Sequence, residues 1–255
     1  MKITDIRFGK IDRRKCIKAG LFSAFILFIF VSCGIDDEPY LEPIDASTVV
    51  VTSNTGARVT IAVESGEGDY SPNFLLYYKI YISGASESGT ISSAEDRSRI
   101  NATLSSDYNG INTYTTLNTT NRPVFSPTVF SNRNFYAMIV NSIETFSGSG
   151  TITLNFENPS NSALLPSLTR GGETHTLYRS TGSGSFVPLP EDNRRFWNFT
   201  ELRNTQNKDV AQRDGGGDYS YCAVYIIKRG VNPNTLSAIY SAPTFIAVFR
   251  LPERY

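Results

Sequence analysis

Histidine and cysteine are scarce in this chain of 255 residues, which contains one His and three Cys. A single His excludes multi-His metal centres and leaves little room for His-dependent catalysis. The first 32 residues hold seven of the 24 basic and two of the 24 acidic residues, which leaves 17 basic and 22 acidic residues for the remainder. This net charge of −5 argues against nucleic-acid binding, which requires clustered basic residues.

Long apolar runs are also rare, and the clearest one lies close to the N-terminus. It extends over 13 residues, Ala19–Val31, and follows a segment that carries all seven basic residues of the leader. A helix of this length measures about 20 Å, whereas the hydrocarbon core of a bilayer is about 30 Å thick. A basic segment, a short apolar segment and a small residue after it predict a secretory signal peptide over residues 1–32.

A cysteine follows this signal directly, in the order Phe30-Val31-Ser32-Cys33-Gly34. This segment resembles the signal of bacterial lipoproteins, and Phe30 in place of the usual Leu is similar to the relaxed signals of spirochaete lipoproteins. The resemblance implies cleavage between Ser32 and Cys33, a diacylglyceryl thioether on Cys33 and acylation of the new amino terminus. The membrane lipid would then be a partner, since several acyl chains give stable anchoring. An uncleaved anchor and an ordinary signal are the alternatives.

Residues 33–46 are predicted to be an acidic tether. Asp36, Asp37 and Glu38 could suggest a cation site, but a run of like charges is typical of a solvated linker. The residue after Cys33 is Gly34 rather than Asp, which favours the outer membrane of a bacterial envelope, on its periplasmic or surface side, over the inner membrane.

The third cysteine, Cys222, is the only one left for the body of the mature chain, which therefore has no internal disulfide. Its neighbours form an apolar strand pattern. We expect Cys222 to be a buried small hydrophobic residue rather than a reactive thiol, and we expect burial to stabilise the body.

Short runs of β-branched and aromatic residues, separated by Gly, Asn, Ser and Pro, fill the rest of the chain and predict an all-β fold. The residues Val59, Ile61 and Val63 alternate with polar ones, as on a half-buried strand. Residues 74–82 are apolar on both faces apart from Lys79, which indicates a strand covered on both sides or one whose Tyr hydroxyls reach solvent. The expected strands are Ser47–Thr52, Ala57–Glu64, Phe74–Ser83, Asn112–Leu117, Asn134–Ser142, Gly150–Phe156, His175–Arg179, Phe196–Leu202, Tyr219–Lys228 and Thr244–Leu251.

The C-terminal quarter contains Phe196–Leu202, Asp218–Ile227 and Tyr240–Val248. These segments resemble the last three strands of a fibronectin type III or immunoglobulin-like domain. The resemblance implies that Tyr219 opens the penultimate strand and hydrogen-bonds back to the preceding corner. The chain departs from these domains in having no early Trp and in the gap of more than 100 residues between the third expected strand and Phe196.

Two organisations fit that gap. Residues 47–255 form one immunoglobulin-like sandwich with a β-rich insertion at about 84–190, or two β domains stand in tandem with a boundary near Asn158–Pro166. Residues 84–122 are rich in Ser, Thr, Asn and Gly, and we expect them to form long mobile connections, with a hairpin at Asn109-Gly110.

Candidate catalytic and metal-binding residues are few. His175 stands alone and no Gly-x-Ser-x-Gly elbow precedes a helix, so we expect a surface histidine and no catalytic residues. Asp209, Asp214 and Asp218 lie in a Gly-rich loop that could suggest calcium, but their spacing does not match a calcium loop. We therefore assign no metal and no cofactor.

Tyrosines on polar loops are the remaining candidates for binding, because they provide contact area at low entropic cost. Tyr70, Tyr108 and Tyr114 are in such positions. The sequence thus predicts a non-catalytic envelope lipoprotein that binds a protein or glycan ligand or acts in adhesion. A structural or assembly role in the envelope is the alternative, followed by a hydrolase.

Overall fold

A computed structural model describes most of the chain from Tyr40 to Glu253. The described residues are 40–52, 57–63, 73–87, 91, 94–114, 125–140, 145–147, 150–157, 166–180, 195–197, 202, 207–212, 217–233 and 235–253. Residues 40–255 form one compact unit, and residues 1–39 are grouped apart from it. The predicted signal, its cleavage site and Cys33 lie outside the described residues.

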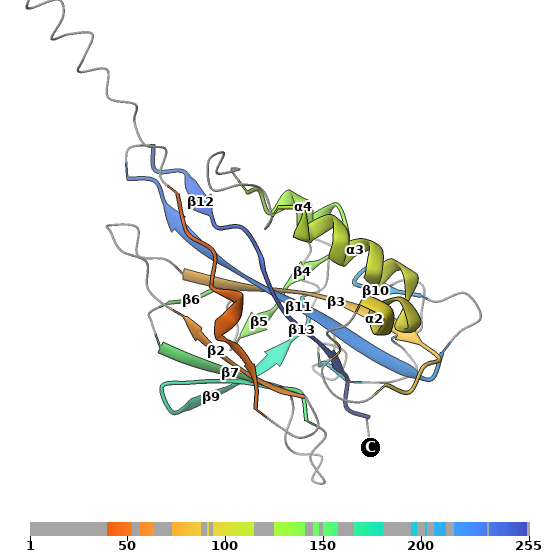
Figure 1. Cartoon of the computed structure of the whole chain (residues 1–255). Helices are drawn as coiled ribbons and strands as arrows, with labels where there is room; N and C mark the ends of the chain where they lie inside the picture. The colour runs from red at the N-terminus through yellow and green to blue at the C-terminus, as the bar shows by residue number, and fades with distance from the viewer. Residues whose placement is uncertain are drawn as a thin grey trace, which may run out of the picture. The chain divides into compact units, whose positions relative to one another are not determined.

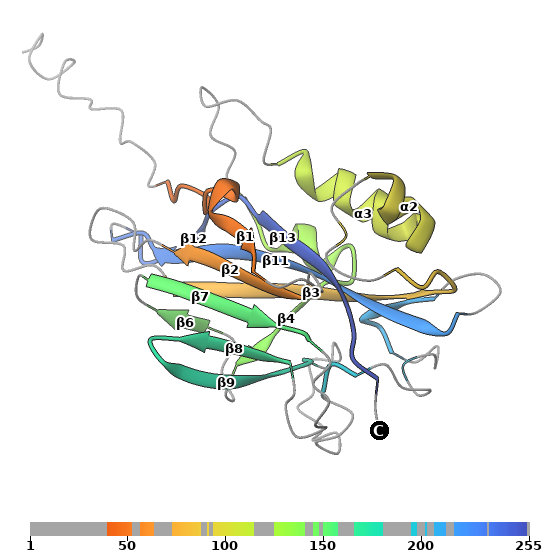
Figure 2. The ribbon, with the colours of Figure 1, turned by 60° about the horizontal axis from the view of Figure 1, so that its bottom comes forward.

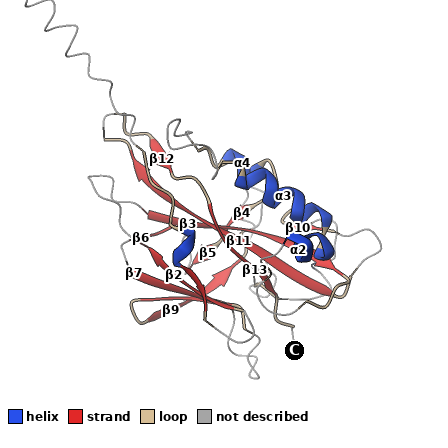
Figure 3. Ribbon diagram, in the orientation of Figure 1, coloured by secondary structure: helices blue, strands red, loops and turns tan. Residues whose placement is uncertain are grey.

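The first sheet has six strands in the order β1-β2-β7-β8-β9-β5, and all of its pairs are antiparallel. A short 3-10 helix, η1 (Ala46–Thr48), leads into it. The strands are β1 (Val49–Val51), β2 (Arg58–Val63), β5 (Ile139–Val140), β7 (Gly150–Asn155), β8 (Ser167–Arg170) and β9 (Glu173–Tyr178) (Figures 2 and 3).

The second sheet is built on two long strands, β3 (Asn73–Ser83) and β11 (Tyr219–Val231), which pair antiparallel along eleven positions. On the outer edge of β11 lie β12 (Ala238–Tyr240) and β13 (Thr244–Arg250). On the outer edge of β3 lie β4 (Tyr136–Ala137), β6 (Thr145–Ser147) and the parallel strand β10 (Val210–Ala211). The prediction of an all-β sandwich of antiparallel sheets is confirmed.

Each face of β3 and β11 packs against a different hydrophobic core. One core lies between the sheets, where Leu76, Ile80 and Val224 meet the buried side chains of β2 and β7. The second core covers the opposite face, where Tyr81 and Tyr225 are buried. Because successive side chains of a strand point to opposite faces, a strand between two cores is apolar throughout. Of the two interpretations of residues 74–82, coverage on both sides is therefore the correct one.

Helices form the cover of this second face, and the sequence analysis did not predict them (Figure 2). They are α2 (Ala94–Ile100), α3 (Ala102–Asn112) and α4 (Thr128–Ser131). The side chain of Asn101 accepts a hydrogen bond from the Thr103 backbone N–H at 2.9 Å and so caps α3. Ile100, Leu104 and Ile111 are buried at helical spacing.

The predictions for this segment were therefore wrong in two respects. Residues 94–100 and 102–112 are helical rather than a mobile connection, and the expected strand Asn112–Leu117 begins with the end of α3 and a turn. Asn109-Gly110 lies within α3 rather than in a hairpin. A Cβ at Gly110 would lie 2.2 Å from a guanidinium nitrogen of Arg133, so the glycine leaves room for that side chain.

The segment 84–190, in which an insertion is expected, contributes strands to both sheets. Its strands β5, β7, β8 and β9 belong to the first sheet, and β4 and β6 belong to the second. Four strands, β6, β8, β10 and β12, lie outside the strands expected from the sequence. The expected strand Phe196–Leu202 is not seen in its described residues, because Phe196 and Trp197 lie outside any strand.

Apolar residues in the last part of the predicted tether are buried in the folded body. Leu41 and Ile44 are buried, and Ile44 is part of the core between the sheets. The hydroxyl of Thr244, at the start of β13, donates a hydrogen bond to the Ile44 carbonyl at 2.6 Å. The structure thus describes residues 40–46 of the predicted tether 33–46, and the apolar residues Leu41 and Ile44 among them are buried.

Candidate functional site

A buried ion pair lies under α3, on the helix-covered face of β3. The Lys79 ammonium is 2.7 Å from the Asp107 carboxylate and donates a second hydrogen bond to the Arg133 carbonyl at 2.7 Å. The hydroxyl of Tyr81 donates to the same carboxylate at 2.8 Å. Lys79 is the one charged residue in the apolar run of β3, and this pairing explains how it is buried.

A second buried ion pair lies on the opposite face, next to the core between the sheets. Arg179 donates to both carboxylate oxygens of Asp209, from Nε at 2.8 Å and from a terminal nitrogen at 2.6 Å. The Tyr78 hydroxyl lies 2.8 Å from this carboxylate and 2.8 Å from the Ser180 carbonyl oxygen. Burial, and then the charge of Asp209, raise the pKa of Tyr78 well above its usual value.

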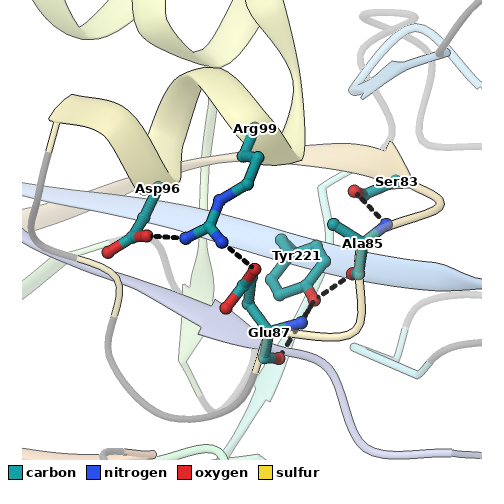
Figure 4. A network of polar contacts seen from close by, with 6 residues as sticks. All are labelled: Ser83, Ala85, Glu87, Asp96, Arg99 and Tyr221. Atoms are coloured by element: carbon teal, nitrogen blue, oxygen red, sulfur yellow. Dashed lines mark hydrogen bonds and ion pairs between the residues drawn. The ribbon is translucent and has the colours of Figure 1, made fainter.

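A third network fixes the segment that leaves β3 (Figure 4). The Tyr221 hydroxyl lies 2.6 Å from the Ala85 carbonyl and accepts a hydrogen bond from the Glu87 backbone N–H at 2.7 Å. The carboxylate of Glu87 pairs with Arg99 of α2 at 3.2 Å, and Arg99 also pairs with Asp96. The network ties the end of β3 to β11 and to the first helix.

This network corrects the role predicted for Tyr219. Tyr219 opens β11 as expected, but its ring is half-buried and lies 4.4 Å from the Arg250 guanidinium carbon. The hydroxyl that bonds back to the backbone belongs to Tyr221, two residues later on the same face of β11. Residues two positions apart on a strand point to the same face, so the sequence pattern fits either tyrosine in this role. The two differ in burial, and Tyr221 is the fully buried one.

The three aspartates of the Gly-rich loop do not form a described site. Asp209 forms an ion pair with Arg179, Asp218 is exposed, and Asp214 lies outside the described residues. Among the residues that the structure describes, no group of three or more His, Cys, Asp or Glu side chains could hold a metal ion.

His175 and Cys222 occupy the positions expected of them. His175 lies half-buried on β9 with its Nε2 atom 3.7 Å from Glu173, a largely exposed carboxylate. Cys222 is a free and fully buried cysteine in the core between the sheets. Burial raises the pKa of its thiol well above the usual value, which keeps it protonated.

The tyrosines proposed for binding do not form a displayed cluster. Tyr70 lies outside the described residues. Tyr108 packs edge-on against Phe245 at 4.9 Å and stacks under the Arg97 guanidinium at 3.6 Å. Tyr114 packs against Phe125 at 5.8 Å. Tyr108 and Tyr114 are thus half-buried, and both pack in the helix layer rather than standing on open loops.

Exposed large apolar side chains mark two other segments of the described chain. Val50 and Val51 lie on the edge strand β1, and Val231 and Leu236 lie on the hairpin that joins β11 to β12. Leu236 is 79% exposed. Sequence reasoning missed it, although an apolar residue within the polar turn Asn-Pro-Asn-Thr-Leu-Ser was a visible signal.

No protein-family model, no curated protein and no solved structure matches this chain. Among its described residues, none of the helices is both long enough and apolar enough to span a membrane.

Proposed function

We propose that this protein is an envelope lipoprotein, held at a membrane by acyl chains on Cys33, whose β-sandwich acts as a non-catalytic binding or adhesion module. The observation that carries the proposal is the order of segments at the N-terminus: seven basic residues, 13 apolar residues and then Ser32-Cys33. A secretory signal that ends at a cysteine is the pattern that lipid attachment requires.

The described body fits a tethered module. It begins at Tyr40, seven residues after Cys33, and seven residues of extended chain reach at most about 24 Å. A folded unit would therefore be held close to the lipid headgroups, either outside the cell or in the periplasm.

A non-catalytic role is supported by the buried acidic groups. Among the described residues, Asp107 and Asp209 are the buried carboxylates, and each is neutralised by a cation and bonded to a Tyr hydroxyl. A general base needs a lone pair that can reach substrate. Carboxylates bonded in this way connect strands, helices and loops to one another, which is a structural role rather than a catalytic one.

The strand order supports an immunoglobulin-like type of sandwich. In such domains the first, second and fifth strands share one sheet, and the third, sixth and seventh share the other. Here β1, β2 and β7 are neighbours, and β3, β11 and β13 are neighbours. On this proposal α2, α3 and α4 lie between the third strand and those that follow it, as an addition to the sandwich.

Metabolic labelling tests the anchor. Cells that produce the native protein are grown with radiolabelled palmitate, and the protein is compared with the variant Cys33→Ala. We expect label in the native protein and none in the variant. Label that survives the substitution would contradict attachment at Cys33.

Protease treatment of intact cells then distinguishes display outside the cell from a periplasmic position. Loss of the body on treatment of intact cells, with a periplasmic marker left uncut, is expected for an adhesion module. Full protection would instead favour the structural role in the envelope.

A further inference from the structure

The hairpin between β11 and β12 carries an apolar residue where the backbone disfavours one. Asn232 and Ser237 close the turn through a backbone hydrogen bond of 2.8 Å, and the Leu236 N–H donates to the Asn232 carbonyl at 2.8 Å. Leu236 has a φ of 56°, in the left-handed region. Gly and Asn adopt this conformation readily, whereas a bulky side chain is uncommon there.

The same residue has the most exposed large apolar side chain among the described residues. An exposed leucine gains nothing from burial within the fold, and Asn or Gly would suit the backbone better. Both the conformation and the exposure therefore work against Leu236 as a purely structural residue. An unfavourable backbone conformation of this kind points to a role outside folding.

The charge of the hairpin differs from that of the body. Residues 228–240, from one strand through the turn to the next, contain Lys228, Arg229 and no acidic residue, whereas the chain from residue 33 onward is acidic overall. Lys228 is buried, and Arg229 is half-buried at the base of the turn. Arg229 therefore supplies the positive charge at the base of this apolar turn, and a surface of this kind is complementary to an anionic lipid leaflet.

The hairpin lies in the half of the sheet where the chain enters the body. Ile44 is bonded to Thr244, and Thr244 pairs with Ile226, five residues before Val231. The opposite end of β11 pairs with Arg250, near the C-terminus. Since β11 has 13 residues at about 3.3 Å each, its two ends are roughly 40 Å apart. Figures 1 and 2 show the described chain beginning on the side of β12 and ending far from it.

We propose that the tip of the β11–β12 hairpin, with Leu236 in the turn and Val231 at its base, contacts the membrane surface to which Cys33 is anchored. The inference rests on the proposed lipid anchor, which brings the entry side of the body to the headgroups. Leu236 and Val231 then enter the interface, and the hairpin is a second contact that limits the orientations of the body on its tether. A tether alone would leave these orientations free.

The test uses the mature acylated protein with a new thiol at the tip. Cys33 is acylated and Cys222 is buried, so Leu236→Cys provides the accessible thiol for an environment-sensitive nitrobenzoxadiazole dye. The matched control is Glu253→Cys, an exposed position beside the far end of β11. Each labelled protein is added to vesicles of phosphatidylethanolamine and phosphatidylglycerol, and the floated fraction is collected.

Fluorescence of the floated fraction gives the result. We expect a blue shift and quenching by spin-labelled lipid for the dye at position 236, and a water-like spectrum for the dye at position 253. Flotation with a water-like spectrum at position 236 would overturn the hairpin contact alone, as would the same blue shift at both positions. Failure of the protein to float would overturn the anchor and this inference with it.

A second variant separates membrane contact from stability. Leu236→Asn suits the left-handed backbone, so its melting temperature is expected to equal or exceed that of the native protein. With the dye moved to Ser237→Cys, the blue shift is expected when Leu236 is present and is expected to disappear when Leu236→Asn is added. A shift that persists in the Leu236→Asn protein would contradict the role of this side chain. Binding of a soluble envelope protein to the tip in place of lipid would also contradict it.

Discussion

The two faces of β3 and β11 are covered by different kinds of structure. Toward the first sheet, the core is built largely of aliphatic residues from strands, such as Val59, Ile61 and Leu154. Toward the helices, the core is rich in aromatic rings, and Phe130 lies within 6 Å of four others, including Tyr77 at 4.3 Å. Strands of facing sheets interdigitate through alternating side chains, whereas the helix face is filled by large rings in edge-on and stacked pairs.

A buried ion pair lies on each face among the described residues, and neighbouring residues of β3 bond to the two pairs. Tyr78 bonds to Asp209 on the face toward the first sheet, and Lys79 bonds to Asp107 on the helix face. Burial of a charge is costly unless it is paired and hydrogen-bonded. Each ion pair therefore favours one covering segment on its face of the sheet. On the helix face, α3 brings the Asp107 carboxylate that neutralises the Lys79 ammonium.

The largest effect is expected from removing one partner of the helix-side pair. Asp107→Ala leaves the Lys79 ammonium buried without its carboxylate, and we expect a loss of about 3–5 kcal/mol in the free energy of unfolding. Urea denaturation measures it. The double variant Lys79→Met/Asp107→Leu removes both charges and is expected to be close to the native protein. A loss below about 1 kcal/mol in Asp107→Ala would mean that the helices open and let water reach Lys79.

The pH dependence of stability tests both faces together. Burial raises the pKa of Tyr78 and of Tyr81 well above 10, and each also lies beside a carboxylate. The unfolded chain therefore loses these two hydroxyl protons at a lower pH than the folded chain. The contribution of the two tyrosines to the free energy of unfolding is complete below pH 10 and is lost as the pH rises above 10.

Denaturation between pH 9 and 11, with tyrosinate absorbance followed in parallel, measures this effect. We expect the free energy of unfolding to fall over this range, and Tyr78 and Tyr81 each add up to one proton to the slope. The groups of Tyr221, Tyr225 and Cys222, whose pKa burial also raises, add to the same slope. Ionisation of all tyrosines while the protein stays folded would show that these hydroxyls reach solvent.

A smaller effect is expected from the hydroxyl that holds the end of β3. Tyr221→Phe removes its bonds to Ala85 and Glu87 and should cost about 1–2 kcal/mol, because partly buried backbone groups lose their partner. Tyr219→Phe is the matched control, and we expect a change within about 0.5 kcal/mol. A larger loss for Tyr219→Phe than for Tyr221→Phe would restore the role first predicted for Tyr219.

The strands could be predicted from the sequence because their side chains alternate. Val59, Ile61 and Val63 are all buried, and the unbroken apolar run of β3 is covered on both faces. The helices could not be identified in the same way. Segment α2 reads Ala-Glu-Asp-Arg-Ser-Arg-Ile, with few apolar residues to show a period, and the burial of α3 depends on Lys79, which is distant in sequence.

The candidate sites were predicted less well, for a related reason. Whether Asp209 binds a metal or an arginine depends on Arg179, 30 residues away. Which of two tyrosines on one face of β11 bonds to the backbone depends on the path of the chain after β3. The exposed Leu236 could have been noticed from its polar neighbours alone, but its left-handed backbone could not.

The most direct test of the account is the intact mass of the mature protein taken from its native membrane. The account predicts a chain that begins at Cys33 and carries a diacylglyceryl group and a further acyl chain, with every added mass located on that residue by fragmentation. A chain that retains residues 1–32, or a Cys33 with an unmodified thiol, would contradict it.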